Sequence, residues 1–259
     1  SLVFNIGLLF VFKYLSLFLP PIDPMMANIY KAAHPWKGML LNAVYFSIPV
    51  GISFYTFQSL SYTFDVYFGK QKAETNLIKY ATFVAYFPPL VAGPIERFGH
   101  LSTQIFEQHK PLYSNFVKGF RLMLLGFFLK MCIADNAGNY ADAVFAKPED
   151  FSSPAVLLGM LMFGLQIYAD FSGYSLIALG ASLWLGISLV DNFRTPYLSR
   201  SVTEFWKRWH LSLTAWFRDY LYIPLGGNKV KIYRWVINVL VVFLISGFWH
   251  GANYTFIIW

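Results

Sequence analysis

Long apolar runs separated by short polar connectors dominate the hydrophobic pattern of this chain. A membrane-spanning helix needs about 20 apolar residues, because a rise of about 1.5 Å per residue must cross about 30 Å of hydrocarbon. Polar groups hidden inside a membrane protein allow shorter or broken helices, so the number of spans can change by one or two. Seven segments come near the required length: residues 2–19, 39–62, 77–91, 116–132, 154–170, 171–190 and 232–249. The pattern predicts an all-α, polytopic membrane protein.

Composition supports this class of fold. Of the 259 residues, 57% are hydrophobic and 13% are charged, whereas a soluble domain has about 25% charged residues. The apolar excess excludes a disordered chain, and the single cysteine, Cys132, excludes a disulfide scaffold. The net charge of +7 indicates cytoplasmic loops rich in Lys and Arg rather than a nucleic-acid-binding surface. No repeat or internal boundary is visible, so we predict a single domain over residues 1–259.

The charges of the connectors predict a topology. Residues 191–234 hold eight basic residues against three acidic ones, which favours the cytoplasmic side. Residues 142–150 hold one Lys against three acids and are expected outside. The two assignments conflict if residues 154–190 form two full spans, because two spans return the chain to the same side. One of these pieces is then re-entrant, or the acidic loop is assigned to the wrong side.

Residues 204–222 are unusually rich in aromatic side chains. One face of a helix over this range would carry Phe205, Trp206, Trp209, Leu213, Trp216, Phe217 and Tyr220, and another would carry Lys207, Arg208, Thr214 and Arg218. Trp and Tyr favour the headgroup level of a membrane, and a basic face suits anionic lipid. The pattern predicts an interfacial helix, which could serve as an anchor alone or as part of a functional site.

His250 is the leading candidate for chemistry on the residues alone. It follows the apolar run 239–249, and an ionisable group at membrane depth is costly enough to suggest a function. Apolar surroundings would keep the imidazole neutral and able to accept a proton. Gly247 and Gly251 would leave room for a ligand. A histidine that only packs between helices remains the open alternative.

The other histidines carry weaker signals. His210 follows Trp209 and on its own would be a polar residue at the water boundary. A metal site needs three or four ligands, and no carboxylate or thiolate cluster accompanies His210 and His250, so we predict no metal. Solvated loop positions are expected for His34, His100 and His109.

Two further residues stand out within apolar segments. Asp170 has no Lys or Arg nearby in the sequence, since none occurs between Lys147 and Arg194, so its partner must come from elsewhere in the fold. Cys132 has no base near it in the sequence and is expected to be a small buried hydrophobic residue.

Several stretches together resemble the membrane-bound O-acyltransferase family. The likeness is to its bacterial branch, which includes alginate and peptidoglycan O-acetylation proteins and the teichoic acid D-alanyltransferase. The stretches that carry it are PVGISFYTFQSLSYTFDVYFG (49–69), FPPLVAGPIER (87–97), QIYADFSG (166–173), NFRTPYLSRSVTEFWKRWHLSLTAWFRDYLYIPLGG (192–227) and FWHGAN (248–253). The segment YLYIPLGGN looks most like the alginate-acetylation subgroup.

The resemblance implies a fold and a pair of site residues. The family's catalytic histidine, in its W-H-G motif, matches His250. Its second polar position, an asparagine in many eukaryotic members, matches His210. The family fold is a ring of tilted helices around a tunnel, in which acyl donor and acceptor meet from opposite membrane faces. Members begin earlier and continue beyond the W-H-G helix, so we expect this chain to be part of a longer one.

The function implied is O-acyl transfer in a multi-pass protein of the plasma (inner) membrane. An acetyl group would move from cytosolic acetyl-CoA, with no bound cofactor, to a hydroxyl acceptor of an exopolysaccharide or cell-wall polymer outside. An extracytoplasmic acetyltransferase or the polysaccharide itself would be the partner. The alternatives are D-alanyl transfer to teichoic acid, a transporter and a non-catalytic scaffold. A transporter would be favoured by inverted repeats, which the sequence does not show.

Overall fold

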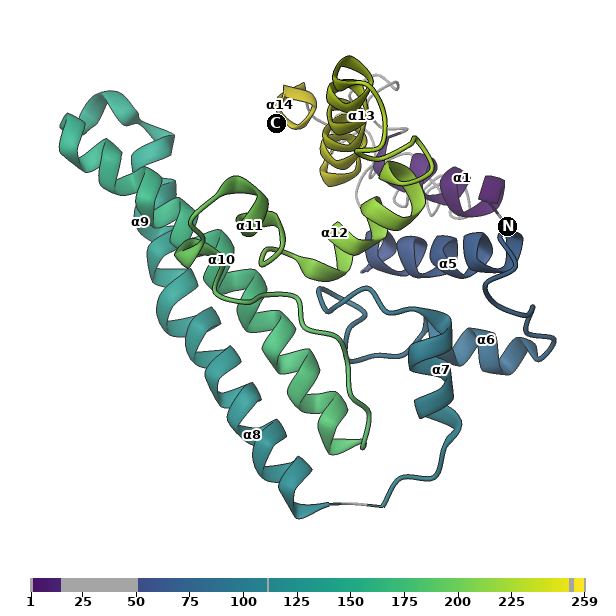
Figure 1. Cartoon of the computed structure of the whole chain (residues 1–259). Helices are drawn as coiled ribbons and strands as arrows, with labels where there is room; N and C mark the ends of the chain where they lie inside the picture. The colour runs from purple at the N-terminus through teal and green to yellow at the C-terminus, as the bar shows by residue number, and fades with distance from the viewer. Residues whose placement is uncertain (1, 15–50, 111, 252–253, 259) are drawn as a thin grey trace, which may run out of the picture. The chain divides into compact units, whose positions relative to one another are not determined.

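The computed structural model describes residues 2–14, 51–110, 112–251 and 254–258. Every regular element within these residues is helical, which confirms the all-α prediction (Figure 1). The chain divides into two compact units. The first compact unit comprises Ser1–Asn76 with Ala215–Trp259, and the second comprises Leu77–Thr214.

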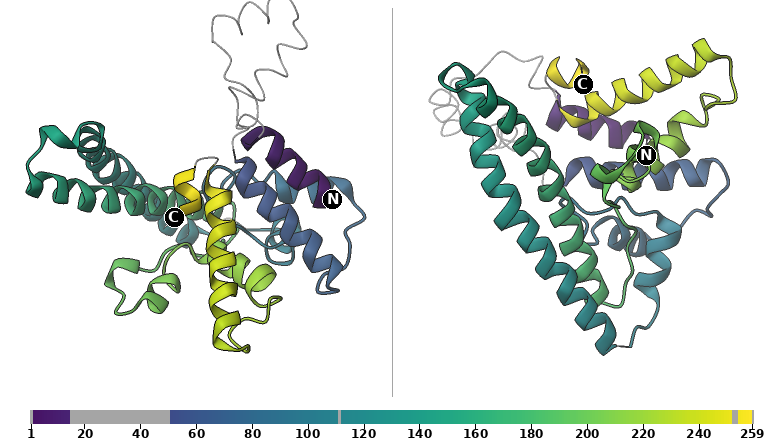
Figure 2. Two further views of the ribbon diagram at one scale, coloured as in Figure 1. Left: turned by 90° about the horizontal axis from the view of Figure 1, so that it is seen from above. Right: turned by 60° about the vertical axis from the view of Figure 1, so that its left-hand side comes forward.

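Two long antiparallel segments form the body of the second compact unit (Figure 2). Helix α8 (Tyr113–Phe127) continues through a π-helical stretch, η1 (Phe128–Ala134), into α9 (Asp135–Ala146). After the short turn η2 (Pro148–Asp150), helix α10 (Ser153–Trp184) returns alongside.

Helix α10 has well-defined ends. Pro154 lies in its first turn, where a missing backbone N–H leaves no hydrogen bond unmade. At the other end Gly186 has φ +80°, and the N–H of Ile187 donates to the carbonyl of Ser182 at 2.9 Å. This is a Schellman motif, which satisfies the last carbonyls of the helix and reverses the chain.

The prediction of two spans over residues 154–170 and 171–190 is wrong, because α10 is one helix of 32 residues. No proline interrupts it, and at about 1.5 Å per residue it is about 48 Å long. By length and composition it could cross a membrane once, as could α13 (Ile232–His250), which matches the predicted span 232–249. A single crossing removes the conflict between the acidic loop before α10 and the basic segment after it. Which side each loop faces stays a prediction.

The other predicted spans correspond only in part to helices of the structure. The span 77–91 is wrong, because α6 (Leu77–Val84) has only 8 residues and Pro88-Pro89 prevents its continuation. The span 116–132 lies inside the continuous segment from α8 to α9. Of 2–19 and 39–62, the structure describes α1 (Leu2–Lys13) and the start of α5 (Ile52–Tyr67). The remainder of both falls outside the described residues.

The aromatic segment 204–222 is not one interfacial helix. It contains α11 (Val202–Trp206), a turn, α12 (Leu211–Phe217) and the π-helical η4 (Arg218–Tyr222). The turn contains His210, whose φ of +43° is incompatible with a continuing α-helix. The sequence pattern did not show the turn because the residues that stabilise it come from a distant loop.

Aromatic packing in the first compact unit buries Trp216 inside the protein. Phe57 of α5 lies 4.3 Å from Trp216 and 5.0 Å from Trp249 of α13, measured between ring centroids. The indole N–H of Trp216 donates to the carbonyl of Phe57 at 3.0 Å, and the hydroxyl of Tyr220 donates to Asp65 at 2.7 Å. These rings are buried inside the protein and form the core of this unit.

Glycines bring α8 and α10 close together. A Cβ added to Gly173 would lie 2.7 Å from the carbonyl oxygen of Gly126, and one added to Gly180 would lie 2.4 Å from that of Gly119. The two pairs are seven residues apart on each helix, so they lie on one stripe. Small residues at such a stripe are how membrane helices pack most closely.

Candidate active site

His210 packs against aromatic side chains in the second compact unit. Its side chain is 4% exposed, so the interpretation as a residue at the water boundary is wrong. The imidazole lies edge-on to Phe171 of α10, with 4.5 Å between ring centroids, and stacks against Phe193 at 6.4 Å. Its left-handed backbone conformation is uncommon for a residue other than Gly, although Asn, Asp and His adopt it more often than the rest, and it persists where surrounding contacts impose it.

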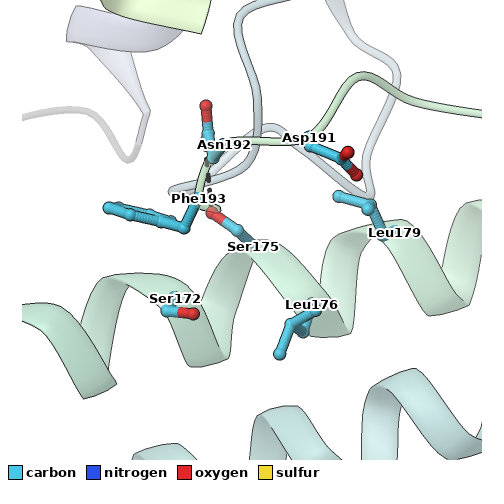
Figure 3. Close-up of a pocket in the computed structure, with 7 residues that line it drawn as sticks. All are labelled: Ser172, Ser175, Leu176, Leu179, Asp191, Asn192 and Phe193. Carbon is cyan, nitrogen blue, oxygen red and sulfur yellow. Dashed lines mark hydrogen bonds between the residues drawn. The ribbon is translucent and has the colours of Figure 1, made fainter. Parts of the chain in front are cut away.

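Asn192 supplies some of those contacts. It is 1% exposed, and its side-chain NH₂ donates to Oγ of Ser175 at 3.1 Å, while its side-chain oxygen accepts from Oγ of Ser212 at 2.6 Å. A small hollow of about 30 Å³ lies beside it, lined by Ser172, Ser175, Leu176, Leu179, Asp191, Asn192 and Phe193 (Figure 3). This hollow has room for a water molecule or two and not for an acyl donor.

A buried carboxylate stabilises the same region. Glu96 is 1% exposed, its Oε1 accepts from the backbone N–H of Val190 at 2.7 Å, and its Oε2 lies 2.7 Å from Nδ1 of His100. The hydrogen bond to Glu96 raises the pKa of His100, and burial opposes this in part. His100 is exposed, as expected, but it lies on α7 (Phe98–Phe106) rather than in a loop, and it pairs with Glu96. His109 is exposed, as expected, and His34 lies outside the described residues.

The Glu96–His100 pair should make stability depend on pH. Because the pKa of folded His100 is raised above its ordinary value of about 6.5, the pair stabilises the protein fully below that pH. The contribution is lost as the pH rises through the pKa of the folded state. The thermal midpoint of the wild type should fall more than that of His100→Gln between about pH 6 and about pH 9. His109→Gln, which removes a histidine that contacts a backbone carbonyl, should keep the wild-type slope. Parallel curves for the wild type and His100→Gln would contradict the assignment.

His250 is the last residue of α13, in the first compact unit. Its side chain is exposed in the described part of the chain, and its nearest aromatic neighbours are Trp249, at 4.6 Å between centroids, and Phe256, at 6.5 Å. These two rings contribute to the apolar surroundings that the sequence predicts for His250. His210 belongs to the other unit.

Lys13, the last residue of α1, and Tyr14, which follows it, cap the end of the helix that carries His250. Lys13 Nζ donates to the carbonyl oxygen of Trp249, and the hydroxyl of Tyr14 donates to that of Phe248. The last carbonyls of a helix have no partners within it, and a cation there also complements the helix dipole. The Lys13 ammonium also lies 5.4 Å from the centre of the Trp249 ring. The position of His250 is therefore fixed through its backbone.

The partner of Asp170 comes from a distant segment, as predicted. Lys130 of η1 lies 2.6 Å from Asp170 of α10 and 2.7 Å from Asp135. Cys132, in contrast, is exposed, so its predicted burial is wrong. The segment from α8 to α9 buries the side that faces α10 and exposes the other side, where Cys132 lies. No cluster of three metal-ligating side chains occurs among the described residues.

Sequence reasoning missed Asn192 and Glu96. Asn192 is the first residue of NFRTPYLS and Glu96 is the fourth residue of GPIER, two stretches that contribute to the family resemblance. Both residues lie in connectors without helical periodicity, so no pattern in the sequence marks them as buried.

The described chain is helical, it has two helices long and apolar enough to cross a membrane, and its two candidate site residues are the buried His210 and His250 at the end of α13. The sequence matches the membrane-bound O-acyltransferase family over residues 70–259, and the chain belongs to this family. The resemblance seen in the sequence is thereby confirmed.

The chain is similar to several individual members of this family. The chain is 47% identical to a probable alginate O-acetylase of Azotobacter vinelandii over 212 residues, 82% of this chain and 42% of that protein. It is 34% identical to the peptidoglycan O-acetyltransferase of Helicobacter pylori over 288 residues, 100% of this chain and 52% of that protein. A teichoic acid D-alanyltransferase of Streptococcus thermophilus is 32% identical over 227 residues, 80% of this chain and 53% of that protein. The chain thus spans about half the length of these relatives.

Proposed function

We propose that residues 1–259 form part of one acyltransferase domain that moves an acetyl group from a cytosolic thioester to a hydroxyl acceptor outside. Family membership carries this proposal, because the matched residues 70–259 include both His210 and His250. Two of the relatives, moreover, are named as O-acetylating proteins of alginate and peptidoglycan. The D-alanyltransferase relative supports D-alanyl transfer as the second candidate.

The chemistry requires a base for the attacking hydroxyl and a group that stabilises the developing oxyanion. We assign the first role to His250, which accepts the hydroxyl proton as the oxygen attacks the thioester carbonyl carbon. His210, or a backbone N–H near Gly251, would polarise the carbonyl oxygen. When the tetrahedral intermediate collapses, the C–S bond breaks, and the leaving thiolate takes the proton from His250. No covalent intermediate with the enzyme is needed.

The same proposal includes the surroundings of the reaction. Acetyl-CoA is the donor substrate and approaches from the cytoplasmic side, where the basic residues 191–234 would lie. The acceptor is a polysaccharide, or an extracytoplasmic acetyltransferase that passes the acetyl group on. The protein is a multi-pass protein of the plasma membrane, with neither metal nor nucleic acid in its function. A tunnel that excludes water would prevent hydrolysis of the thioester.

Sealed membrane vesicles that contain the full-length protein test both the reaction and its direction. With labelled acetyl-CoA added outside, inside-out vesicles should transfer the label to a hydroxyl acceptor in their lumen. Right-side-out vesicles should not, because their donor side is enclosed. Vesicles that lack the protein are the control. Transfer of D-alanine and not of acetyl would favour the second candidate, and no difference from the control would favour a transporter or a scaffold.

A further inference from the structure

Asn192 joins three segments of the second compact unit that are distant in the sequence. Its side chain bonds to Ser175 of α10 and to Ser212 of α12, and the N–H of Ser212 points to the same amide oxygen at 3.4 Å. Oγ of Ser212 in turn accepts from the backbone N–H of Ile95 at 3.0 Å. Figure 3 shows Asn192 above α10 with its side chain beside Ser175. Because this network is buried, water cannot take the place of a side chain that is removed. The remaining polar groups would then lack hydrogen-bond partners.

The backbone beside Asn192 also holds the turn that contains His210. The N–H of Leu211 donates to the carbonyl of Asn192 at 2.9 Å, and the N–H of Arg194 donates to the carbonyl of Arg208 at 3.0 Å. These two hydrogen bonds lie on either side of His210. Between them, Phe193 contacts the imidazole ring. Residues 192–194 thus contact both the backbone of the turn and the ring of His210, and these contacts set the backbone conformation and the ring orientation.

We infer that Asn192 is a positioning residue, which fixes residues 192–194 between α10 and α12 and through them orients His210. This inference rests on the proposed function, because its effect appears through the role of His210 in polarising the thioester. The site needs one donor, for Ser175, and one acceptor, for Ser212, and an amide supplies both. A displacement of about 1 Å in a catalytic group can cost about 100-fold in rate, even when the altered residue does not touch substrate.

A double-mutant cycle in the full-length protein tests the inference. Asn192→Ala should lower kcat by about 10-fold or more and change KM little, because the lost interaction acts in the transition state. In a His210→Ala background, the same substitution should lower kcat by less than about twofold, since the residue that it positions is gone. Equal fold losses in the two backgrounds would overturn the inference.

Asn192→Asp adds a readout that a general loss of structure would not give. The protonated carboxyl has the shape of the amide, with an O–H that can donate to Ser175 and an oxygen that can accept from Ser212. The ionised form is a buried charge, and burial favours the neutral form. The kcat of this variant relative to the wild type should therefore rise as the pH is lowered from about 8 to about 6. A ratio that does not change with pH would contradict the proposed hydrogen bonds.

Matched variants separate the possible failures. Ser172→Ala removes another hydroxyl from the same hollow, without a bond to Asn192, and should leave kcat unchanged. If Asn192→Ala does not accumulate in membranes, Ser175→Ala removes only one of its partners and should show a smaller loss with the same dependence on His210. Full activity of His210→Ala would contradict the proposed role of His210, whereas a merely additive cycle contradicts only the role of Asn192.

Discussion

His250→Ala should lower acetyl transfer by at least about 100-fold, because general-base catalysis contributes about 10² to 10⁴ in rate. The amount of protein in the membrane should stay the same. The imidazole is exposed in the described part of the chain, and the end of α13 is held by Lys13 and Tyr14 through backbone carbonyls that alanine keeps. The measurement is transfer from labelled acetyl-CoA in membranes that contain the full-length protein.

The controls for this prediction use the other histidines. His109→Ala removes an exposed histidine from the second compact unit and should keep normal turnover. His210→Asn should retain more activity than His210→Ala, because the amide still donates a hydrogen bond. Near-normal turnover by well-folded His250→Ala protein would end the proposed mechanism and leave both histidines with structural roles.

Gly173→Ala should destabilise the protein by about 1–3 kcal/mol, the usual cost of forcing a methyl group into a closely packed contact. The new Cβ would lie 2.7 Å from the carbonyl oxygen of Gly126 and 3.2 Å from the backbone nitrogen of Lys130. Both are backbone atoms, so α8 and α10 must move apart. The midpoint of thermal unfolding in detergent should fall by several degrees.

Gly164→Ala is the matched control on the same helix. Its nearest neighbour outside the helix would be the Tyr197 hydroxyl at 3.6 Å, an ordinary contact. Alanine favours a helix over glycine by about 1 kcal/mol, so this variant should be as stable as the wild type or more so. If Gly164→Ala and Gly173→Ala unfold at the same temperature, the close approach of the two helices does not contribute to stability.

The sequence was sufficient where structure depends on local pattern. Helix α13 could be predicted nearly to its ends, because it is predominantly apolar, contains no proline and is followed by Gly251. The single helix α10 could not, because its central charge, Asp170, finds a partner in Lys130, forty residues earlier. Residues 77–91 are apolar for a similar non-local reason, since Phe83 of the short α6 is fully buried in the protein.

In the candidate site, too, local sequence pattern was informative and non-local contacts were not visible. Family motifs were enough to select His210 and His250, but the turn at His210 depends on a loop that contacts it only in the folded chain. Asn192 is separated from Ser212 by 20 residues, and Ser212 from Ile95 by 117. No periodicity along the sequence reports such hydrogen bonds, so the supporting residues of the site became visible only in three dimensions.

The two capping side chains at the end of α1, Lys13 and Tyr14, bear on where a minimal piece of this protein could be cut. The stretch matched by the family, residues 70–259, contains both histidines and would look like a natural unit for expression. Such a piece would leave behind Lys13 and Tyr14, which hold the carbonyls beside His250, and Phe57, which packs on the neighbouring Trp249. The end of α13 that carries His250 is thus supported by residues that lie outside the stretch matched by the family, residues 70–259.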